Sequence, residues 1–328
     1  MPASTFRTWG VSAVSAFVSV ATLLASVPAQ AQYPARNIKL VVTNEAGTGP
    51  DLMARLLAAS MSTSLGKPVV VENKIGANGN IATDYVAKSP ADGYTLLLAS
   101  DAQFAINPHV YAKLPFNPQT DFAPVATLGS SDLFLVVNPK LPAKDLKEFI
   151  EFAKKSPVPL NYGSPSSGTQ HHLLMEMLKT RAGINLQHIP YKGGGAAAVA
   201  AVAGDIQVLF GGASAIPLIR SSKLRVLASS GPKRSAAFPD VPTVSEVLPG
   251  FEGLLWMGLF APAGAPPEVL AAIRGAVQKF LASPETAEKL AVAGIDPYAT
   301  TPERFRELIR SDYAKYGQLV NAAGVKFD

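Results

Sequence analysis

Short apolar runs alternate with amphipathic helical patterns along nearly the whole chain after residue 38, and this alternation constrains the fold more than any other feature. An apolar run of roughly four to eight residues predicts a buried strand, whereas apolar residues three and four positions apart predict a helix. We predict strands at 38–42, 69–72, 95–100, 160–163, 187–190, 206–210 and 224–229. We predict helices at 51–65, 80–88, 144–155, 169–181, 196–203 and 215–221. This order indicates parallel sheets covered by helices on both faces.

Two longer apolar runs, LFLVVN at 133–138 and LLWMGLFA at 254–261, divide the pattern into two sets. After the second run the chain shows only helical patterns, at 267–281, 284–292 and 301–323. We therefore predict two α/β lobes joined by two crossover strands. Lobe 1 comprises residues 32–132 together with 255–328, and lobe 2 comprises residues 133–254. Two extended crossings form a hinge, and open α/β sheets bind ligands at the carboxyl ends of their strands, here in a cleft between the lobes.

The amino-terminal segment predicts export. Its first 32 residues carry one charge, Arg7, and an apolar run at 11–27 precedes the sequence Ala29-Gln30-Ala31. This pattern is typical of a secretory signal peptide, residues 1–31, cleaved after Ala31. An uncleaved membrane anchor is disfavoured, because serine and threonine interrupt the run and a spanning helix needs about 20 predominantly apolar residues. The mature protein should act outside the cytoplasm.

Composition excludes several classes of site. The chain has no cysteine, which excludes disulfides, thiolate metal sites and cysteine nucleophiles. Its net charge of +5 becomes +4 without Arg7, and the basic residues are scattered, so we expect no nucleic-acid partner but a small anionic ligand. No pair among the four histidines has the H-E-x-x-H spacing. We expect no metal, no cofactor and no catalytic residue.

Six loops of similar composition follow the predicted strands at their carboxyl ends. They are TNEAGTGPD (43–51), IGANGN (75–80), SDAQ (100–103), GSPSSGTQ (163–170), YKGGG (191–195) and FGGAS (210–214). Glycine allows close backbone approach, hydroxyls donate hydrogen bonds, and helix amino termini attract anions. Capping and turn chemistry could explain each loop alone. Six such loops at equivalent strand ends favour a site for a carboxylate or phosphate that does not depend on lysine or arginine.

The motifs of phosphate and ester enzymes are absent from these loops. No G-x-x-x-x-G-K-[ST] sequence occurs, and the Gly47-Thr48-Gly49 turn lacks the third glycine of a dinucleotide motif, because Leu52 occupies that position. GSPSSG is not a nucleophile elbow, because Pro165 occupies the position of the serine. A ligand site therefore remains the better interpretation.

We expect the ligand contacts to come from these loops. In lobe 1 the expected contacts are Asn44, Glu45, Ala46, Gly47, Thr48, Ala77, Asn78, Ser100, Asp101 and Ala102. In lobe 2 they are Ser164, Ser166, Ser167, Gly168, Thr169, His171, His172, Tyr191, Lys192, Gly193, Gly211 and Gly212.

Three side chains near these loops have more specific expectations. Asp51 is predicted to be the N-cap of the first helix, whose buried face is predicted to include Leu52, Leu56, Ala59 and Thr63. His172 precedes Glu176 by four residues and is predicted to pair with it on the surface. His171 can either pack against the apolar face of its helix or face the ligand.

Several phrases carry a resemblance to a known family. They include YPARNIKLVV, ENKIGANGNIA, GYTLLL, HIPYKGGG, FPDVPTVSE and GLFAPAGAPPEV. Together they resemble the TctC or Bug family, the periplasmic solute receptors of tripartite tricarboxylate transporters, over essentially the whole mature chain. The resemblance implies a two-lobed, type II-like periplasmic-binding-protein fold with parallel-rich sheets that closes over its ligand. It also implies a small carboxylate held by backbone amides and hydroxyls, and delivery to a membrane permease with a large and a small subunit; we expect a monomer.

Two departures from the family pattern bear on the ligand. In the family, the first loop usually reads close to P-F-P-P-G-G-x-x-D. Here only Gly47 and Asp51 are kept, and Glu45 is expected near the opening of the ligand cleft. After the strand at 206–210 many members carry an aspartate that meets an ammonium group, whereas this chain has Gly211. The glycine argues against an amino-acid ligand and predicts space for a bulkier one. We expect a dicarboxylate without an amino group, aromatic dicarboxylates included.

Two other functions are alternatives to a transport receptor. An exported ligand-sensing subunit for a membrane signalling partner would share every feature described above. An exported hydrolase would need a nucleophile with a base, or a metal site, and the sequence offers neither.

Overall fold

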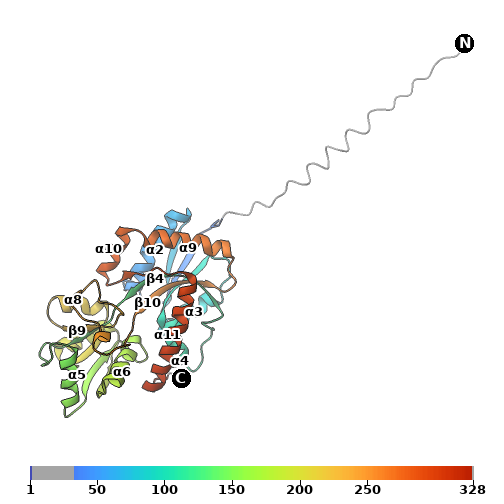
Figure 1. Ribbon diagram of the computed structural model, residues 1–328. Coiled ribbons are helices and arrows are strands. Elements are labelled where there is room, and N and C mark those ends of the chain that lie inside the picture. Colours follow the sequence, from blue (N-terminus) through green and yellow to red (C-terminus); the bar gives the residue numbers. More distant parts are fainter. Residues whose placement is uncertain (2–32, 327–328) are drawn as a thin grey trace.

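The computed structural model describes Met1 and residues 33–326, so the predicted signal peptide lies, apart from Met1, outside the described residues. Figure 1 shows two α/β bodies, one containing the blue and orange segments and the other the green and yellow segments. Each body is built on its own sheet. We call the first sheet with its helices lobe 1 and the second sheet with its helices lobe 2.

Lobe 1 contains a six-stranded sheet in the order β11-β4-β10-β3-β1-β2. Its strands are β1 (Ile38–Val42), β2 (Val69–Asn73), β3 (Thr95–Ser100), β4 (Phe122–Ser131), β10 (Leu255–Pro262) and β11 (Asp296–Pro297). Its helices are α2 (Gly49–Leu65), α3 (Asn80–Ala87), α4 (Asn107–Val110), α9 (Pro267–Leu281), α10 (Pro284–Val292) and α11 (Pro302–Ala323). Successive side chains of β1 enter opposite cores, because Leu40 packs in the core with α2 and α9, whereas Val41 packs with α3 and α11.

Lobe 2 contains a five-stranded sheet in the order β7-β6-β8-β5-β9. Its strands are β5 (Phe134–Val137), β6 (Leu160–Ser164), β7 (Leu186–Pro190), β8 (Val208–Gly211) and β9 (Arg225–Ser229). Its helices are α5 (Leu146–Lys155), α6 (Gln170–Ala182), α7 (Gly194–Ala203) and α8 (Ile216–Arg220). One core joins the sheet to α5 and α6, and a second joins it to α7, so helices cover both faces.

The strand directions confirm the predicted parallel-rich sheets and add antiparallel pairing at the crossover strands. β1 pairs in parallel with β2 and β3, and β6 pairs in parallel with β7 and β8. The strands at the lobe junction are antiparallel to their neighbours: β10 to β3 and β4, and β5 to β8 and β9. β4 was not predicted; it pairs with β10 from Phe122 opposite Pro262 to Ser131 opposite Leu255. The chain leaves lobe 1 after β4 and returns at β10, so the two crossings lie side by side.

The first helix buries a different face from the one predicted. The buried residues of α2 are Asp51, Met53, Ala54, Leu57, Ala58 and Met61. Of the predicted face, Leu52 and Leu56 are half-buried, and Ala59 and Thr63 are exposed. Both stripes have helical spacing, and packing against α9 selects the one that contains Met53 and Leu57.

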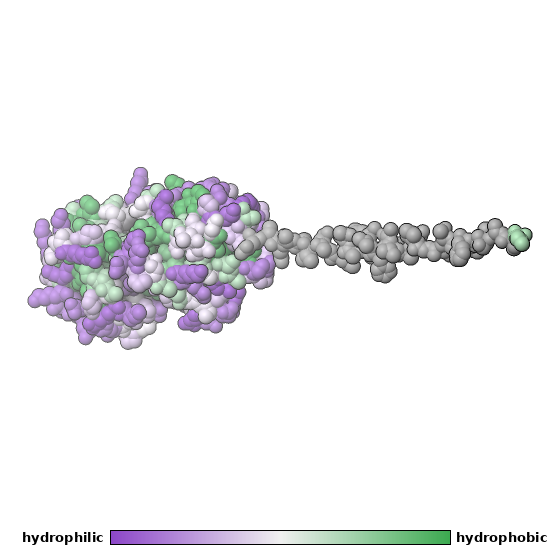
Figure 2. Space-filling view, turned by 90° about the horizontal axis from the view of Figure 1, so that it is seen from above, coloured by the Kyte–Doolittle hydropathy of each residue, from purple (hydrophilic) through white to green (hydrophobic). Residues whose placement is uncertain are grey.

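The outer surface is largely hydrophilic on the face shown in Figure 2, with apolar side chains scattered over it. Among the described residues, no helix combines the length and the apolar character that crossing a membrane requires.

Candidate functional site

The sheet topology gathers the six predicted loops at two edges. Because β1 runs parallel to β2 and β3, the loops that follow these strands lie at one edge of the lobe 1 sheet. The loops that follow β6, β7 and β8 lie at one edge of the lobe 2 sheet for the same reason. The structure therefore brings each set of three loops together, as the sequence pattern predicts.

The two edges approach one another at two places. Gln170, the first residue of α6, donates a hydrogen bond from Nε2 to the hydroxyl of Tyr316 in α11 at 2.6 Å, and Leu173 packs in one cluster with Ile106. Figure 1 shows α11 running beside α6 at this junction. On the other flank, a Cβ built on Gly294 would lie 2.5 Å from Cδ1 of Ile216 in α8.

The turn before α2 is held by a buried carboxylate. Gly47 has a φ of +82° and donates its N–H to Oδ2 of Asp51 at 2.9 Å. Asp51 is 2% exposed and also accepts from Arg55 Nε and Asn73 Nδ2, both at 2.9 Å. Burial alone would raise the pKa of Asp51, but the hydrogen bonds from Arg55, Gly47 and Asn73 outweigh it and lower the pKa. Asp51 therefore remains a charged acceptor that fixes the turn.

The predicted N-cap position of Asp51 is wrong. The N-cap of α2 is Thr48, and the helix starts at Gly49, so Asp51 lies in the first turn. Thr48 donates its hydroxyl to the carbonyl of Glu45 at 2.7 Å, and its side chain accepts no capping hydrogen bond from the first-turn amides of α2. Asn44, Glu45, Ala46 and Gly47 are exposed, and Thr48 is half-buried, so this turn presents its backbone at the surface.

The loop after β2 holds two consecutive non-glycine residues in the left-handed region, Ala77 (φ +46°) and Asn78 (φ +51°). Each costs about 1–2 kcal/mol relative to a right-handed residue. The carbonyl of Asn78 accepts from Gln103 Nε2 at 2.8 Å and from Asn107 Nδ2 at 3.0 Å. Strain that neighbours stabilise often marks a functional segment. Gln103 and Asn107 were not predicted as site residues, because their partner Asn78 precedes them by 25 and 29 residues in the sequence.

The turn after β3 contains two half-buried residues, Ser100 and Ala102, and one buried acid, Asp101. Gln103 Oε1 accepts from the Ser100 amide at 3.0 Å, and Ser100 Oγ accepts from the Ala102 amide at 3.2 Å. Asp101 is 1% exposed, and its Oδ2 has no hydrogen-bond partner. Burial, with a contribution from the nearby Asp312, raises the pKa of Asp101 to about 8. Asp101 therefore lies beneath the loop surface at the lobe junction.

The turn before α6 has its own internal hydrogen bonds. Gly168 has a φ of +70° and donates its N–H to Nδ1 of His172 at 3.1 Å. The hydroxyls of Ser164 and Thr169 both donate to the carbonyl of Ser166, each at 2.8 Å. Thr169 is the N-cap of α6. Ser166 is exposed and Ser167 is half-buried, so these two residues are available to a ligand.

His172 pairs with Glu176 as predicted, but the pair does not lie at the surface, because His172 is buried beneath this turn. It is 6% exposed, and its Nε2 lies 3.9 Å from Glu176 Oε1. Its ring stacks on His188 with centroids 3.9 Å apart and an interplanar angle of 8°. Burial, with a smaller contribution from His188, lowers the pKa of His172 to about 4, so the ring is neutral near pH 7. Glu176 also accepts hydrogen bonds from Lys179 Nζ at 2.7 Å and from the Tyr162 hydroxyl.

His188 was not predicted as a site residue, yet its Nε2 lies 2.7 Å from Ser164 Oγ. Its position in β7, directly above the loop that joins β6 to α6, follows from parallel pairing, which sequence spacing alone does not reveal. His171 is partly exposed, and a Cβ built on Gly212 would lie 3.5 Å from its Nε2. Burial lowers the pKa of His171 to about 4.

The loop after β7 is tied to the turn before α6. The Tyr191 amide donates to Ser164 O at 2.9 Å, and the Gly193 amide donates to Pro165 O at 3.0 Å. Tyr191 is half-buried, and Lys192 and Gly193 are exposed. Gly193 has a φ of +100° and is the N-cap of α7, where a side chain would be strained.

The expectation that Gly211 leaves room for a bulkier ligand is wrong. Gly211 is buried, and a Cβ built on it would lie 2.5 Å from the Cβ of Ala215. The glycine therefore accommodates the following turn of its own chain. Gly212 is the residue whose Cβ direction points toward Leu133 and His171.

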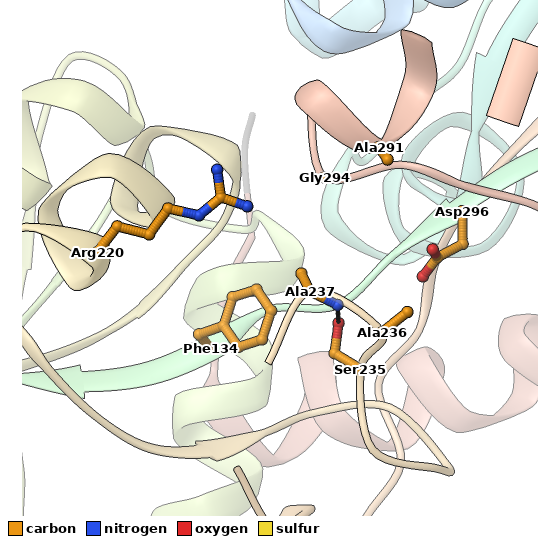
Figure 3. A pocket seen from close by; sticks show the side chains of 8 residues that line it. All are labelled: Phe134, Arg220, Ser235, Ala236, Ala237, Ala291, Gly294 and Asp296. Carbon is orange, nitrogen blue, oxygen red and sulfur yellow. Dashed lines mark hydrogen bonds between the residues drawn. The ribbon is translucent and has the colours of Figure 1, made fainter. Parts of the chain in front are cut away.

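Two cavities lie elsewhere at the lobe junction. One has a volume of 260 Å³ and is lined by Phe134, Arg220, Ser235, Ala236, Ala237, Ala291, Gly294 and Asp296. Figure 3 shows Arg220 and Asp296 on opposite walls, with the Ala237 amide donating to Ser235 Oγ between them. The other, of 680 Å³, shares Ser235, Ala236 and Asp296 with it and extends toward α11. The predicted ligand residues, all of which the structure describes, line neither cavity.

The described residues contain no group of three or more histidine, aspartate or glutamate side chains placed to hold a metal ion. The hydrogen-bond donors of the six loops include backbone amides and hydroxyls, together with the side-chain amides of Asn44 and Asn78 and the ammonium group of Lys192. Such donors suit an anionic ligand.

Comparison with known proteins identifies relatives over nearly the full length. The model of the tripartite tricarboxylate transporter family receptor, TctC, matches residues 53–325. Protein BugT of Bordetella pertussis is 36% identical over 322 residues, covering 96% of this chain and 98% of BugT. A UPF0065 protein of Cupriavidus necator, from the gbd 5' region, is 34% identical over 319 residues, covering 96% of this chain and 96% of that protein.

Solved structures of similar proteins share the fold. Rpa4515 of R. palustris, determined with adipate, has a TM-score of 0.80 and 32% identity, covering 90% of this chain and 99% of that chain. MatC (Rpa3494) of Rhodopseudomonas palustris, determined with bound malate, has a TM-score of 0.75 and 29% identity, covering 88% of this chain and 100% of that chain. These matches confirm the predicted two-lobed α/β fold and the family resemblance. The matched family consists of receptors, which excludes the hydrolase alternative.

Proposed function

This chain belongs to the TctC family of tripartite tricarboxylate transporter receptors, and we propose that it binds a small dicarboxylate without an amino group between its two lobes. Its ligand contacts come from the two turns before α2 and α6, residues 44–48 and 166–169, in which every residue except Gly168 is exposed or half-buried, with Ala77, Asn78, His171, Lys192, Gly193 and Gly212 around them. Asp101 and Gly211 are both buried, so they support these contact residues from beneath and do not contact the ligand themselves.

One observation carries this proposal: two turns with matching internal hydrogen bonds, one in each lobe, each lead into the amino terminus of a long helix. α2 has 17 residues and α6 has 13, and the first-turn amides of a helix have no partner within it. Each terminus carries about half a positive charge from the helix dipole, which favours a carboxylate there. Two such termini on opposite lobes suit a ligand with two carboxylates.

The ligands of similar proteins support this class. Adipate and malate, bound to the two Rhodopseudomonas proteins, are both dicarboxylates without an amino group. Glu45 is an exposed residue of the turn before α2. We therefore expect Glu45 to influence which size and charge the distal part of the ligand can have. Aromatic dicarboxylates remain part of the proposed class.

We propose that the protein delivers this ligand to a membrane permease with a large and a small subunit, and its membership of a tripartite transporter receptor family supports this role. For that role the protein would be exported by cleavage of residues 1–31, act in the periplasm as a monomer, and close about the two crossings between β4 and β5 and between β9 and β10. The proposed lobe boundaries are residues 32–132 with 255–328, and residues 133–254.

A thermal-shift screen of mature protein with adipate, malate, phthalate, aspartate and propionate tests the ligand class. Ligand at 100 times its dissociation constant should stabilise the protein by about 2.7 kcal/mol, so dicarboxylates should raise the melting temperature more than propionate. Ser166→Ala should weaken binding by about 1–3 kcal/mol, whereas the distant control Ser283→Ala should not. The proposal fails if no dicarboxylate shifts the melting temperature, and the exclusion of an amino group fails if aspartate shifts it most.

A further inference from the structure

The hydrogen bonds of Ser164 determine the protonation of His188. A serine hydroxyl carries one proton, and Ser164 Oγ uses it to donate to the carbonyl of Ser166 at 2.8 Å. Ser164 must therefore accept at its 2.7 Å contact with His188. It follows that Nε2 of His188 carries a proton and donates it to Ser164.

The ring of His172 also carries its proton on Nε2, but for a different reason. Its Nδ1 lies 3.1 Å from the Gly168 nitrogen, whose N–H is the donor. Because Nδ1 accepts, it carries no proton, and the neutral ring must carry its proton on Nε2. The two stacked rings therefore hold two points of one turn, Ser164 at its start and Gly168 near its end.

The groups around the two rings favour the neutral state. The titratable neighbours that face them are Tyr162 from β6 and Glu176 and Lys179 from α6. Burial lowers the pKa of both rings and outweighs the opposite effect of Glu176, which is already paired with Lys179 and with the Tyr162 hydroxyl. A second proton on His172 would set an N–H against the Gly168 N–H, and two charged rings 3.9 Å apart would repel.

We propose that His172 and His188 are positioning residues that, as neutral imidazoles protonated at Nε2, fix the turn at 164–169 in the geometry that receives the ligand carboxylate. Neither ring needs to touch the ligand, because His172 acts through the Gly168 amide and His188 through Ser164. Proton uptake by His172 removes the acceptor of Gly168 and releases that end of the turn. The effect on binding rests on the proposed function, whereas the effect on the turn does not.

The ligand-free test uses nitrogen-15 NMR of the mature protein. Both rings should show the Nε2–H form at pH 7, and the Gly168 amide should be protected from hydrogen exchange. In His172→Leu that protection should fall at least tenfold, and in His172→Asn, whose side-chain oxygen can replace Nδ1, it should be retained. An Nδ1–H form of His172, or unchanged Gly168 exchange in His172→Leu, would overturn the proposal.

The binding test measures adipate and malate affinity by calorimetry at pH 7.5. His172→Leu should weaken binding about five- to tenfold, the equivalent of one lost buried hydrogen bond, and His172→Asn should bind within about twofold of the unmodified protein. His188→Gln, which keeps a donor toward Ser164, should likewise bind more tightly than His188→Leu. The matched control is His109→Leu, which removes a histidine bonded to the Tyr313 carbonyl at 2.8 Å, outside the turn, and should leave affinity unchanged.

The outcomes separate the two proposals. Equal weakening by the leucine and asparagine variants of His172 would overturn the positioning role while leaving the receptor function intact. If the unmodified protein binds neither adipate nor malate, the choice of these two ligands fails, and the NMR measurements still decide the role of the histidines.

Discussion

The turns before α2 and α6 are two copies of one local structure. Each places a glycine in the left-handed region, Gly47 and Gly168, followed by a threonine N-cap, Thr48 and Thr169. Each threonine hydroxyl donates to the carbonyl three residues earlier, at 2.7 Å and 2.8 Å. In each turn the glycine amide donates to a side chain four residues later. The shared sequence behind this structure is only Gly-Thr.

The two copies differ in the side chain that receives the glycine amide. Asp51 is a carboxylate that Arg55 and Asn73 keep charged, whereas His172 is a neutral ring stacked on His188. A charged acceptor with a lowered pKa persists over most of the pH range, but an imidazole acceptor is lost once it binds a second proton. The lobe 1 turn should therefore resist acid, and the lobe 2 turn should not.

The largest expected effect is the loss of the charged acceptor. Asp51→Leu leaves the Gly47 amide and Asn73 without their partner and should lower the free energy of unfolding by about 3 kcal/mol. Asp51→Asn keeps an acceptor oxygen but loses the charge opposite Arg55, so it should cost about half as much. Urea unfolding at pH 7 measures both. Equal losses would mean that burial, and not hydrogen bonding, makes Asp51 important.

The acid response of the lobe 2 turn should be nearly as large. The pKa of His172 in the folded protein is about 4, below its ordinary value of 6.5. Its contribution to stability is therefore present above pH 6.5 and is lost as the pH falls toward 4, by about 2–3 kcal/mol. His172→Asn should remove this loss, whereas Asp51→Asn should not. If the unmodified protein and His172→Asn lost stability equally as the pH falls, the expected difference in acid response between the two turns would be wrong.

Asp101 gives lobe 1 the opposite pH response. Burial raises its pKa to about 8 from an ordinary value of 3.8. Its contribution to stability is therefore full below pH 4 and is lost as the pH rises through 8, on the order of 2 kcal/mol after water entry and relaxation. Asp101→Asn should flatten the unfolding free energy between pH 5 and 8.5. If the unfolding free energy of Asp101→Asn instead fell more steeply with rising pH than that of the unmodified protein, Asp101 would be charged and paired in the folded protein.

The sequence predicts a segment well when the residues that determine its structure lie within the segment, and poorly when its structure depends on a partner far away in the sequence. Strands buried on both faces, such as β1 and β3, have continuous apolar runs and were predicted. β4 was missed because Pro124 and the Gly129-Ser130-Ser131 sequence interrupt its apolar run, and its pairing with β10 depends on chain far away in sequence. The choice between two apolar stripes on α2 likewise depends on α9.

The candidate site shows the same division. Loop composition predicted which turns gather at the sheet edges, because Gly, Ser and Thr are needed there locally. Their supporting side chains were not predicted, because each holds a loop outside its own segment: Gln103 and Asn107 bond to Asn78, and His188 bonds to Ser164. Asp51 was misplaced within its own turn, because a threonine and an aspartate three residues apart are both good N-caps and the sequence cannot rank them.

The smallest expected effect tests whether the two turns are equivalent. Thr48→Val and Thr169→Val each remove one hydroxyl that donates to a carbonyl within the turn, with almost no change in shape. Each should cost about 0.5–1 kcal/mol, and the two losses should be equal and additive because the sites lie in different lobes. Urea unfolding of both single variants and the double variant measures this. A clearly larger loss for Thr169→Val would show that the histidine-supported turn depends more on its N-cap, and the two turns would then share a shape without sharing its energetics.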